Sequence, residues 1–328
     1  MRTIYVISGV TGMTGNELAR QLIKNEENEV VGFDNFFASS IDTIKDIIDH
    51  PHLHFFERDI NNEKHLQEIK DKVLSLGEGE VVYINCAAVV HTEYFYEINS
   101  TYDTNVEAMR KFLQQAIEIK ARIFINCSTS EVYSMHSWAD DGVRESDFLE
   151  LATAEHSQRT SYATGKLLTE FFMKDAVEKG LIRGCSIRFA NVYSNHERFA
   201  KHIIPHIINS LREKGEVVLL ENSRKNKRTF LHNIDSCRAV LDLIESPVAL
   251  DGSVYNVATD EEISIIDLVN KIGKKLGLDS PRITFKDYRL SDPERRILNT
   301  EKIREKTKWK PIINLDKGLD LCLEQFQQ

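Results

Sequence analysis

The chain has 328 residues, a formal net charge of −9, 41% apolar and 28% charged residues. This composition is typical of a folded protein with a large core and excludes a disordered chain. The sequence has no cluster of lysines and arginines of the kind that follows a nucleic acid backbone, and no apolar run reaches the roughly 20 residues of a membrane span. We therefore expect neither a nucleic acid nor a membrane as partner.

The cysteines predict neither disulfides nor a metal site. They lie far apart in the sequence, without a CxxC pair or a zinc-ligand spacing, at Cys86, Cys127, Cys185, Cys237 and Cys322. The apolar run after Arg2 is too short for the core of a signal peptide and leads directly into glycines. We expect a cytoplasmic protein with reduced cysteines.

Short β-branched and aromatic runs alternate with longer stretches of helical periodicity, which predicts βαβ units and a parallel sheet. Strands are expected at 3–8, 28–33, 53–57, 81–85, 121–127 and 182–188. Helices are expected at 13–24, 40–49, 63–75, 97–119 and 160–179. The predicted fold class is α/β, a doubly wound parallel (Rossmann) sheet that binds its ligands at the carboxyl ends of its strands.

The regular alternation ends near residue 190. Shorter elements follow, with helices expected near 201–214, 234–245, 264–276 and 315–326 and strands near 217–220 and 228–232. We expect residues 1–190 to form a dinucleotide-binding domain. Residues 191–328 are expected to form mainly a smaller substrate-binding lobe, with some segments returning to the first domain.

A glycine-rich turn follows the first strand. Gly9 permits a tight turn, Gly12 lets the backbone approach a pyrophosphate, and Gly15 lets the next helix pack closely on the strand. Asp34 ends the second strand, where it can accept hydrogen bonds from a ribose 2′-hydroxyl but would repel a 2′-phosphate. The pattern predicts a site for NAD rather than NADP. Asp59, after the third strand, fits either an adenine contact or an exposed loop acid.

Two further motifs carry groups suited to acid–base chemistry. Tyr162 and Lys166 are four residues apart on one helix face, so the ammonium group is expected to lower the pKa of the phenol. The fifth strand ends in Ser128-Thr129-Ser130-Glu131, which sets hydroxyls and a carboxylate at the carboxyl edge of the sheet. Serine and threonine at a strand end are commonly turn formers or helix caps, so this motif gains weight only together with the tyrosine and lysine.

Together these motifs resemble the extended short-chain dehydrogenases/reductases, in the family of NAD-dependent nucleotide-sugar epimerases and dehydratases. The resemblance extends over nearly the whole chain. Its matching stretches are Gly9–Gly15, Asp34-Asn35, Asn85–Ala88, Asp103–Val106, Ser128–Tyr133, Tyr162–Lys166, Arg188–Tyr193, Arg228–Phe230, Tyr255–Val257 and Trp309–Pro311.

The resemblance implies roles for individual residues. Tyr162 would remove the proton of a sugar hydroxyl, Thr129 would hydrogen-bond the same hydroxyl, and Lys166 would bind the nicotinamide ribose. Asn191 resembles the residue that meets the substrate diphosphate, while Arg228 and Arg289 resemble arginine clamps or are plain surface charge. The implied cofactor contacts are Gly9, Thr11, Gly12, Met13, Gly15, Asp34, Asn35, Asp59, Ile60, Ala87, Ala88 and Asn105, with Tyr162 and Lys166. His91 would lie by the sugar or cap a strand.

Glu131 discriminates among the reactions of this family. Thr129-Ser130-Glu131 resembles the triplet of sugar-nucleotide dehydratases and of uridine-diphosphoglucuronate decarboxylases, and a carboxylate there can take the C5 proton once C4 is a ketone. The leading expectation is a 4,6-dehydratase in which Ser130 assists departure of the C6 hydroxyl, or is without a role. A 5,6-elimination or C5 inversion would use the same residues. A 4-epimerase, a decarboxylase and a non-catalytic NAD sensor are the alternatives.

Some features depart from the family pattern. Ser194 replaces a usual glycine, Val89-Val90 replaces a commoner polar pair, and residues 134–159 have no assignable pattern. The long helices at 97–119 and 160–179 resemble those that pair across a twofold axis, so we expect a homodimer. Because the family restores its cofactor within one turnover, we expect NAD to be bound tightly.

Overall fold

The computed structural model describes residues 2–135, 141–197, 199–290 and 292–325. Its centre is a seven-stranded sheet with the strand order β11-β6-β5-β4-β1-β2-β3, and every neighbouring pair is parallel. The strands are β1 (Thr3–Ser8), β2 (Asn28–Asp34), β3 (Leu53–Glu57), β4 (Glu80–Asn85), β5 (Ile123–Thr129), β6 (Arg183–Phe189) and β11 (Asp251–Val257). The order reverses between β1 and β4, which is the switch point where doubly wound sheets bind ligands.

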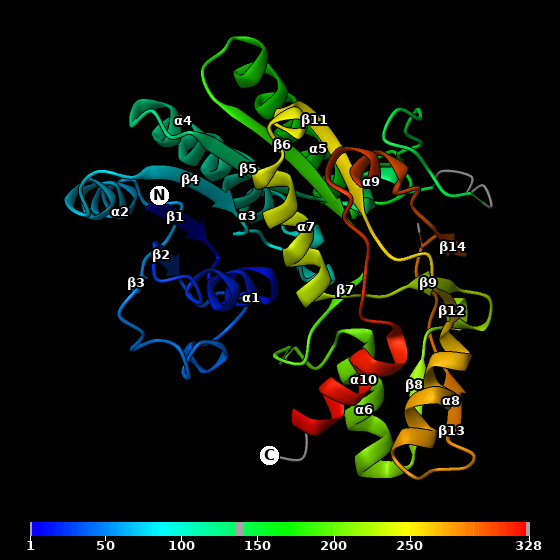
Figure 1. Cartoon of the computed structure of the whole chain (residues 1–328). Helices are drawn as coiled ribbons and strands as arrows, with labels where there is room; N and C mark the ends of the chain where they lie inside the picture. Colours follow the sequence, from blue (N-terminus) through cyan, green and yellow to red (C-terminus); the bar gives the residue numbers. More distant parts are fainter. Residues whose placement is uncertain (1, 136–140, 198, 291, 326–328) are drawn as a thin grey trace.

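Helices cover both faces of the sheet because alternate strand residues point to opposite sides. Tyr5 and Ile7 pack with α1 (Met13–Leu22) and α7 (Asn233–Glu245) on one face. Ile4 and Val6 pack on the other face with α2 (Glu63–Ser75), α4 (Met109–Glu118) and α5 (Thr160–Glu178). Figure 1 shows the resulting three layers. The fold class expected from the sequence is therefore confirmed.

The seventh strand was not expected from the sequence. β11 pairs with β6, although it comes from the half of the chain assigned mainly to the lobe. The helix α9 (Glu301–Thr307) packs beside it. The carboxyl end of this edge of the sheet is therefore built from late segments of the chain.

Two expected helices differ in the structure. Residues 40–49 form turns with one short 3-10 segment, η1 (Ile41–Thr43), because the backbone is bound by tertiary contacts: Arg20 donates to Thr43 O, and the Thr43 hydroxyl donates to Thr11 O at 2.8 Å. The region 97–119 is not one α-helix. It consists of α3 (Ile98–Tyr102), the π-helical turn η3 (Asp103–Ala108) and α4.

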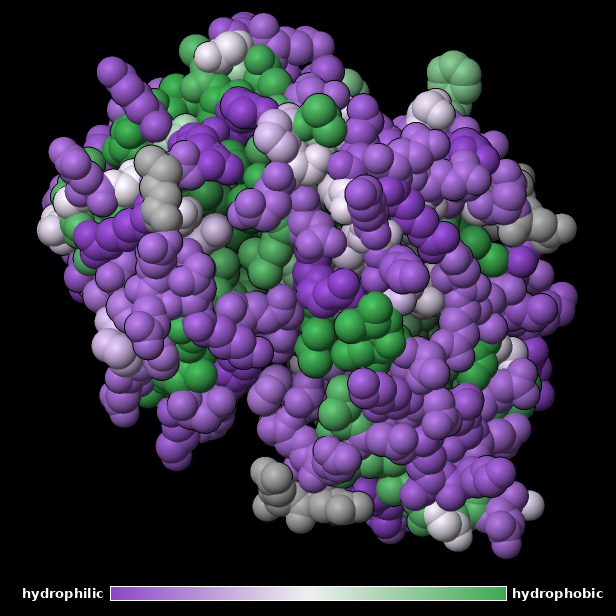
Figure 2. Space-filling model, viewed as in Figure 1, coloured by the Kyte–Doolittle hydropathy of each residue, from purple (hydrophilic) through white to green (hydrophobic). Residues whose placement is uncertain are grey.

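The smaller lobe has its own core. It contains α6 (Ile203–Lys214), α8 (Ile265–Lys275), α10 (Leu315–Gln325) and β8 (Glu216–Leu219), which pairs with β13 (Arg282–Phe285). The short strand β9 (Lys227–Thr229) lies between β12 (Glu262–Ser264) and β14 (Arg295–Arg296), and β10 (Leu231–His232) pairs with β7 (Val192–Tyr193). The expected strand 228–232 is thus divided between two sheets. In Figure 2 a recess separates this lobe from the part that carries β1–β3.

The described residues contain no helix that is both long and apolar enough to cross a membrane.

Candidate active site

The turn after β1 has the close approaches that its glycines predict. Gly9 has φ +71°, and a Cβ there would lie 2.7 Å from Ala87 N. A Cβ on Gly15 would lie 2.2 Å from Gly9 O, so a side chain would push α1 away from the turn. The first turn of α1 therefore opens onto the carboxyl edge of the sheet, where its N–H groups and positive dipole end suit a phosphate.

A cavity of about 700 Å³ lies at this edge, at the switch point between β1 and β4. Its walls include most of the cofactor residues implied by the resemblance: Gly9, Thr11, Gly12, Met13, Gly15, Asp34, Asn35, Asp59, Ile60, Ala87, Ala88, Tyr162 and Lys166. The predicted substrate residues His91, Thr129 and Asn191 also line it. One continuous cavity therefore joins the glycine-rich turn to the catalytic motif.

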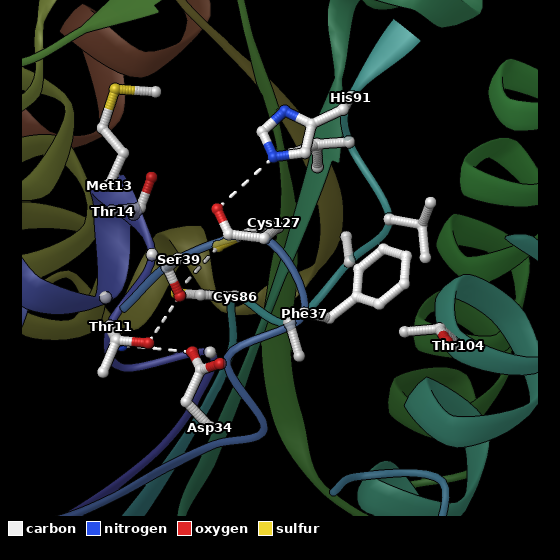
Figure 3. Close-up of a pocket in the computed structure, with 18 of the residues that line it drawn as sticks. Thr11, Met13, Thr14, Asp34, Phe37, Ser39, Cys86, His91, Thr104 and Cys127 are labelled. Atoms are coloured by element: carbon white, nitrogen blue, oxygen red, sulfur yellow. Dashed lines mark hydrogen bonds between the residues drawn. The ribbon is translucent and has the colours of Figure 1, made fainter. Parts of the chain in front are cut away.

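Asp34 lies beside the glycine-rich turn (Figure 3). One carboxylate oxygen accepts a hydrogen bond from Thr11 N at 3.2 Å and the other from Phe36 N at 2.9 Å. The Thr11 hydroxyl also contacts the Ser39 hydroxyl at 2.6 Å. These contacts fix the carboxylate on the cavity wall, where a ribose diol fits better than a phosphate.

Tyr162 is buried between aromatic and polar neighbours. Its ring stacks on that of Phe95, with 4.1 Å between centroids and 6° between planes. Burial raises its pKa well above the usual range and the charge of Glu131 adds to this, whereas Thr129 and Arg159 act in the opposite sense. The lowered pKa expected from Lys166 is therefore wrong for these surroundings, because desolvation of the phenolate exceeds the effect of nearby cations.

Lys166 lies on the same face of α5, one turn beyond Tyr162. It is only 2% exposed, and burial lowers its pKa. Cys86 and Cys127 line the cavity near it, and their sulfur atoms are 3.7 Å apart although they are 41 positions apart in the sequence. All five cysteines are free thiols, as expected.

Glu131 is clamped by two arginines that the sequence reasoning missed. Its carboxylate accepts from Arg296 Nη1 at 2.5 Å and lies 3.1 Å from Arg159 Nη1. Although burial opposes ionisation, Arg296 and Arg159 lower the pKa of Glu131 to about 2. Arg159 precedes Tyr162 by three residues, so helical spacing could have indicated it. Arg296, on β14, gave no comparable signal.

Several predicted residues lie elsewhere. The described residues that line the cavity do not include Ser130, Glu131, Asn105, Arg228 or Arg289. Asn105 instead exchanges two hydrogen bonds with the backbone of Val89, which shapes the cavity wall from behind.

Of the two expected arginine clamps, the Arg228 side chain is paired within the protein, and Arg289 is held through its backbone. The Arg228 guanidinium lies 2.9 Å from Asp292 and is buried, and the backbone of Arg289 is bound by Asn222 at both its N–H and its carbonyl. The Asp292 carboxylate therefore neutralises the Arg228 guanidinium that we expected to bind the substrate diphosphate.

His91 lies in a cluster over the cavity. Its ring stacks on Phe199 at 3.6 Å between centroids, Nδ1 is 3.4 Å from His202 Nε2, and Nε2 is 3.4 Å from Ala38 O. Figure 3 shows this side chain across the cavity from Asp34. His91 therefore joins loops from three parts of the chain rather than only capping a strand.

Comparison with known proteins agrees with this geometry. Residues 5–258 match the model of the NAD dependent epimerase/dehydratase family. UDP-glucuronic acid decarboxylase 5 of Arabidopsis thaliana is 27% identical over 98% of this chain and 89% of its own length. Two crystal structures share the fold. UDP-glucuronic acid 4-epimerase from Bacillus cereus has a TM-score of 0.86 at 21% identity, with 99% of each chain covered. dTDP-glucose 4,6-dehydratase from Streptomyces venezuelae has a TM-score of 0.85 at 20% identity, with 99% of this chain and 97% of the other covered.

The glycine-rich turn and the cavity at the switch point are those of an NAD-binding Rossmann protein, and Thr129, Tyr162 and Lys166 line the same cavity. The match to the family model covers most of the chain, so the chain belongs to the NAD-dependent epimerase/dehydratase family. The residues present fit NAD, because the tight turn at Gly9 and the close packing at Gly15 leave the first turn of α1 facing the cavity, where its N–H groups suit a pyrophosphate, and Asp34 lies on the wall of that cavity.

Proposed function

We propose that this protein acts on a nucleotide-linked hexuronic acid, oxidising C4 and releasing C6 as carbon dioxide. The observation that carries the proposal is the environment of Arg296. Its Nη1 binds Glu131, two residues after the cavity-lining Thr129, while its buried Nε and Nη2 atoms have no hydrogen-bond partner within the described parts of the chain; Arg296 itself lies behind the residues that line the cavity. Buried guanidinium donors without acceptors are costly, and a carboxylate is their natural partner.

The state of Glu131 also favours decarboxylation over dehydration. A dehydratase needs a base for the C5 proton, and a carboxylate with a pKa of about 2 is a weak base. Compared with an ordinary carboxylate, Glu131 in this environment binds a proton less favourably by about 3 kcal/mol. Loss of carbon dioxide from a β-keto acid needs no protein base at C5, so the clamped Glu131 is no obstacle.

The residues of the site divide the reaction between them. Tyr162 takes the proton of the C4 hydroxyl, and Thr129 orients that hydroxyl. Bound NAD supplies the oxidant for C4 and is restored in the same turnover. The C5–C6 bond then breaks and its electron pair stays at C5, which takes a proton from water. The proton held by Tyr162 returns to the C4 oxygen as C4 is reduced. Lys166 would hold the nicotinamide ribose.

The raised pKa of Tyr162 bears on the first step. Since burial keeps the phenol protonated near neutral pH, transfer to Tyr162 requires a cation close to the ring when substrate is bound. Lys166 lies on the same helix face and would supply this charge, to which the positive charge of bound NAD would add. The choice of a hexuronic acid is supported by several relatives from Arabidopsis thaliana, which are UDP-glucuronic acid decarboxylases.

The experiment is a product analysis of the purified protein with UDP-glucuronic acid, UDP-glucose and dTDP-glucose. The proposal expects a product that has lost one carbon dioxide, formed from the hexuronic acid alone. Products that have lost one water from a neutral hexose, or that keep the substrate mass with C4 inverted, would contradict it. The first would show a dehydratase and the second an epimerase.

A 4,6-dehydratase is the second candidate, because Glu131 is close enough to Tyr162 for its charge to raise the phenol pKa. A base next to the C4 group is the arrangement that removal of the C5 proton requires. In that case the substrate would have to displace Arg296 or Arg159 from the carboxylate. Replacing Arg296 by Gln would then raise the rate, whereas the decarboxylase proposal expects a loss.

We also propose that the protein is a homodimer. Ile98 and Tyr102 on α3 and Leu168 and Phe171 on α5 are 41–63% exposed, and an apolar groove lies between these helices. A second copy of the same helices would cover them. Sedimentation that finds only monomer at micromolar concentration would refute this.

A further inference from the structure

A closed ring of buried polar contacts surrounds η4 (Ser130–Tyr133), the turn that follows Thr129 and carries Glu131. It starts at Ser128, whose hydroxyl donates to Glu170 Oε1 at 2.6 Å. Arg188 then donates to both oxygens of Glu170, from Nε at 2.9 Å and from Nη2 at 2.6 Å. Both side chains of this ion pair are 5% exposed. β5, β6 and α5 are thereby tied together directly beneath the site.

The ring continues through Tyr133 at the end of the turn. Arg188 Nη1 donates to the Tyr133 hydroxyl at 2.8 Å, and that hydroxyl donates to Asn256 Oδ1 at 2.8 Å. The guanidinium carbon of Arg188 also lies 4.8 Å from the centre of the Tyr133 ring. Tyr133 and Asn256 are fully buried, so water cannot replace these bonds.

The late segments of the chain close the ring. Asn256 Nδ2 donates to Asn299 O at 3.1 Å and to Val143 O at 2.9 Å. Asn299 follows Arg296 by three residues, and Arg296 binds Glu131 at 2.5 Å. The path that leaves β5 at Ser128 therefore ends at Glu131 in the turn that follows β5, by way of α5, β6, β11 and residues 296–299.

We infer that Tyr133 and the Glu170–Arg188 pair are positioning residues that hold Thr129 and Glu131 in register with the catalytic face of α5. Glu170 lies one turn after Lys166 and two turns after Tyr162 on the same helix. The ring therefore fixes the position of η4 relative to Tyr162 and Lys166. A single 3-10 turn has weak internal hydrogen bonds and cannot hold such a register alone. The inference rests on the proposed function, since its effect on rate is measured on that reaction.

The test compares Tyr133→Phe with the matched control Tyr83→Phe. Each removes one hydroxyl from a fully buried tyrosine with a side-chain partner, but Tyr83 on β4 bonds Gln115 on α4 at 3.2 Å, and neither residue belongs to the ring or lines the cavity. We expect kcat of Tyr133→Phe to fall on the order of 10- to 100-fold with little change in KM, because small misplacements of catalytic groups have effects of this size. Tyr83→Phe is expected to keep the kcat of the unchanged protein.

Hydrogen exchange supplies a readout that does not depend on activity. Amides of residues 129–134 should exchange faster in Tyr133→Phe and at the normal rate in Tyr83→Phe. Unchanged kcat together with unchanged exchange in Tyr133→Phe, or equal losses in the two variants, would overturn the inference. Failure of the proposed function is distinguishable, because the unchanged protein would then release no carbon dioxide while the exchange comparison still decides the role of the ring.

Discussion

The ion pairs of Glu131 with Arg159 and Arg296 make a quantitative prediction about stability. These contacts lower the pKa of Glu131 from 4.5 to about 2 in the folded protein. A depressed pKa in the folded state contributes stability above the unfolded value, and this contribution is lost as pH falls through the folded value. At 1.36 kcal/mol per pKa unit the contribution at neutral pH is about 3 kcal/mol.

The perturbation is Glu131→Gln, which keeps the size of the side chain and removes its charge. At about pH 7 we expect the free energy of unfolding, measured with urea, to fall by about 3 kcal/mol, because two buried guanidinium groups lose their counter-ion. The difference between the two proteins should shrink as pH falls below about 4.5 and vanish near pH 2. The matched control is Glu178→Gln, whose carboxylate is 64% exposed and pairs with Lys174, so its effect should stay under about 1 kcal/mol.

Two outcomes would refute the reasoning. Equal stability of Glu131→Gln and the unchanged protein at neutral pH would show that the arginines do not clamp the carboxylate. A deficit that persists undiminished at low pH would show that the variant lost packing rather than charge. Either result would also remove the argument that Glu131 is too weak a base for dehydration.

Three other variants test the cofactor and catalytic groups. Asp34→Ala should weaken NAD roughly 10- to 100-fold in calorimetric titrations and relax discrimination against NADP, since a charge-assisted bond to the ribose is lost; an unchanged preference would refute the assignment. Tyr162→Phe should lower kcat by at least about 100-fold and leave NAD affinity nearly intact, and a smaller loss would exclude the phenol as the proton acceptor. Gly15→Ala should abolish NAD binding and destabilise the fold by about 1–3 kcal/mol, because the new Cβ meets the Gly9 and Val10 backbone; full retention of NAD would contradict that clash.

Much of the fold could be predicted because its signals are local. Periodicity located the strands β1 to β6, and the spacing of Gly9, Gly12 and Gly15 located the dinucleotide turn, since each property depends on residues close together in the chain. The helix expected at 40–49 failed for the opposite reason: Arg20 and Thr11, more than twenty positions earlier, bind Thr43 and hold the segment in turns.

The proposed catalytic pair, Tyr162 and Lys166, was recognised in the same local way, as a tyrosine and a lysine one helical turn apart. Their pKa values could not be predicted from the local sequence, because desolvation depends on which residues surround the two groups after folding. Phe95 covers the ring of Tyr162, and burial then moves its pKa upward instead of downward. Burial likewise lowers the pKa of Lys166.

The sequence by itself determined the class of fold and the dinucleotide turn, and it is the basis for proposing Thr129, Tyr162 and Lys166 as the catalytic centre, because helix periodicity, strand alternation and motif spacing depend on neighbouring residues. Tertiary structure alone decided the state of Glu131. Its partner Arg296 lies 165 positions away, and only the position of β14 beside the turn η4 brings the two charges to 2.5 Å. Reactivity in this protein therefore depends on contacts between distant segments, which no local pattern encodes.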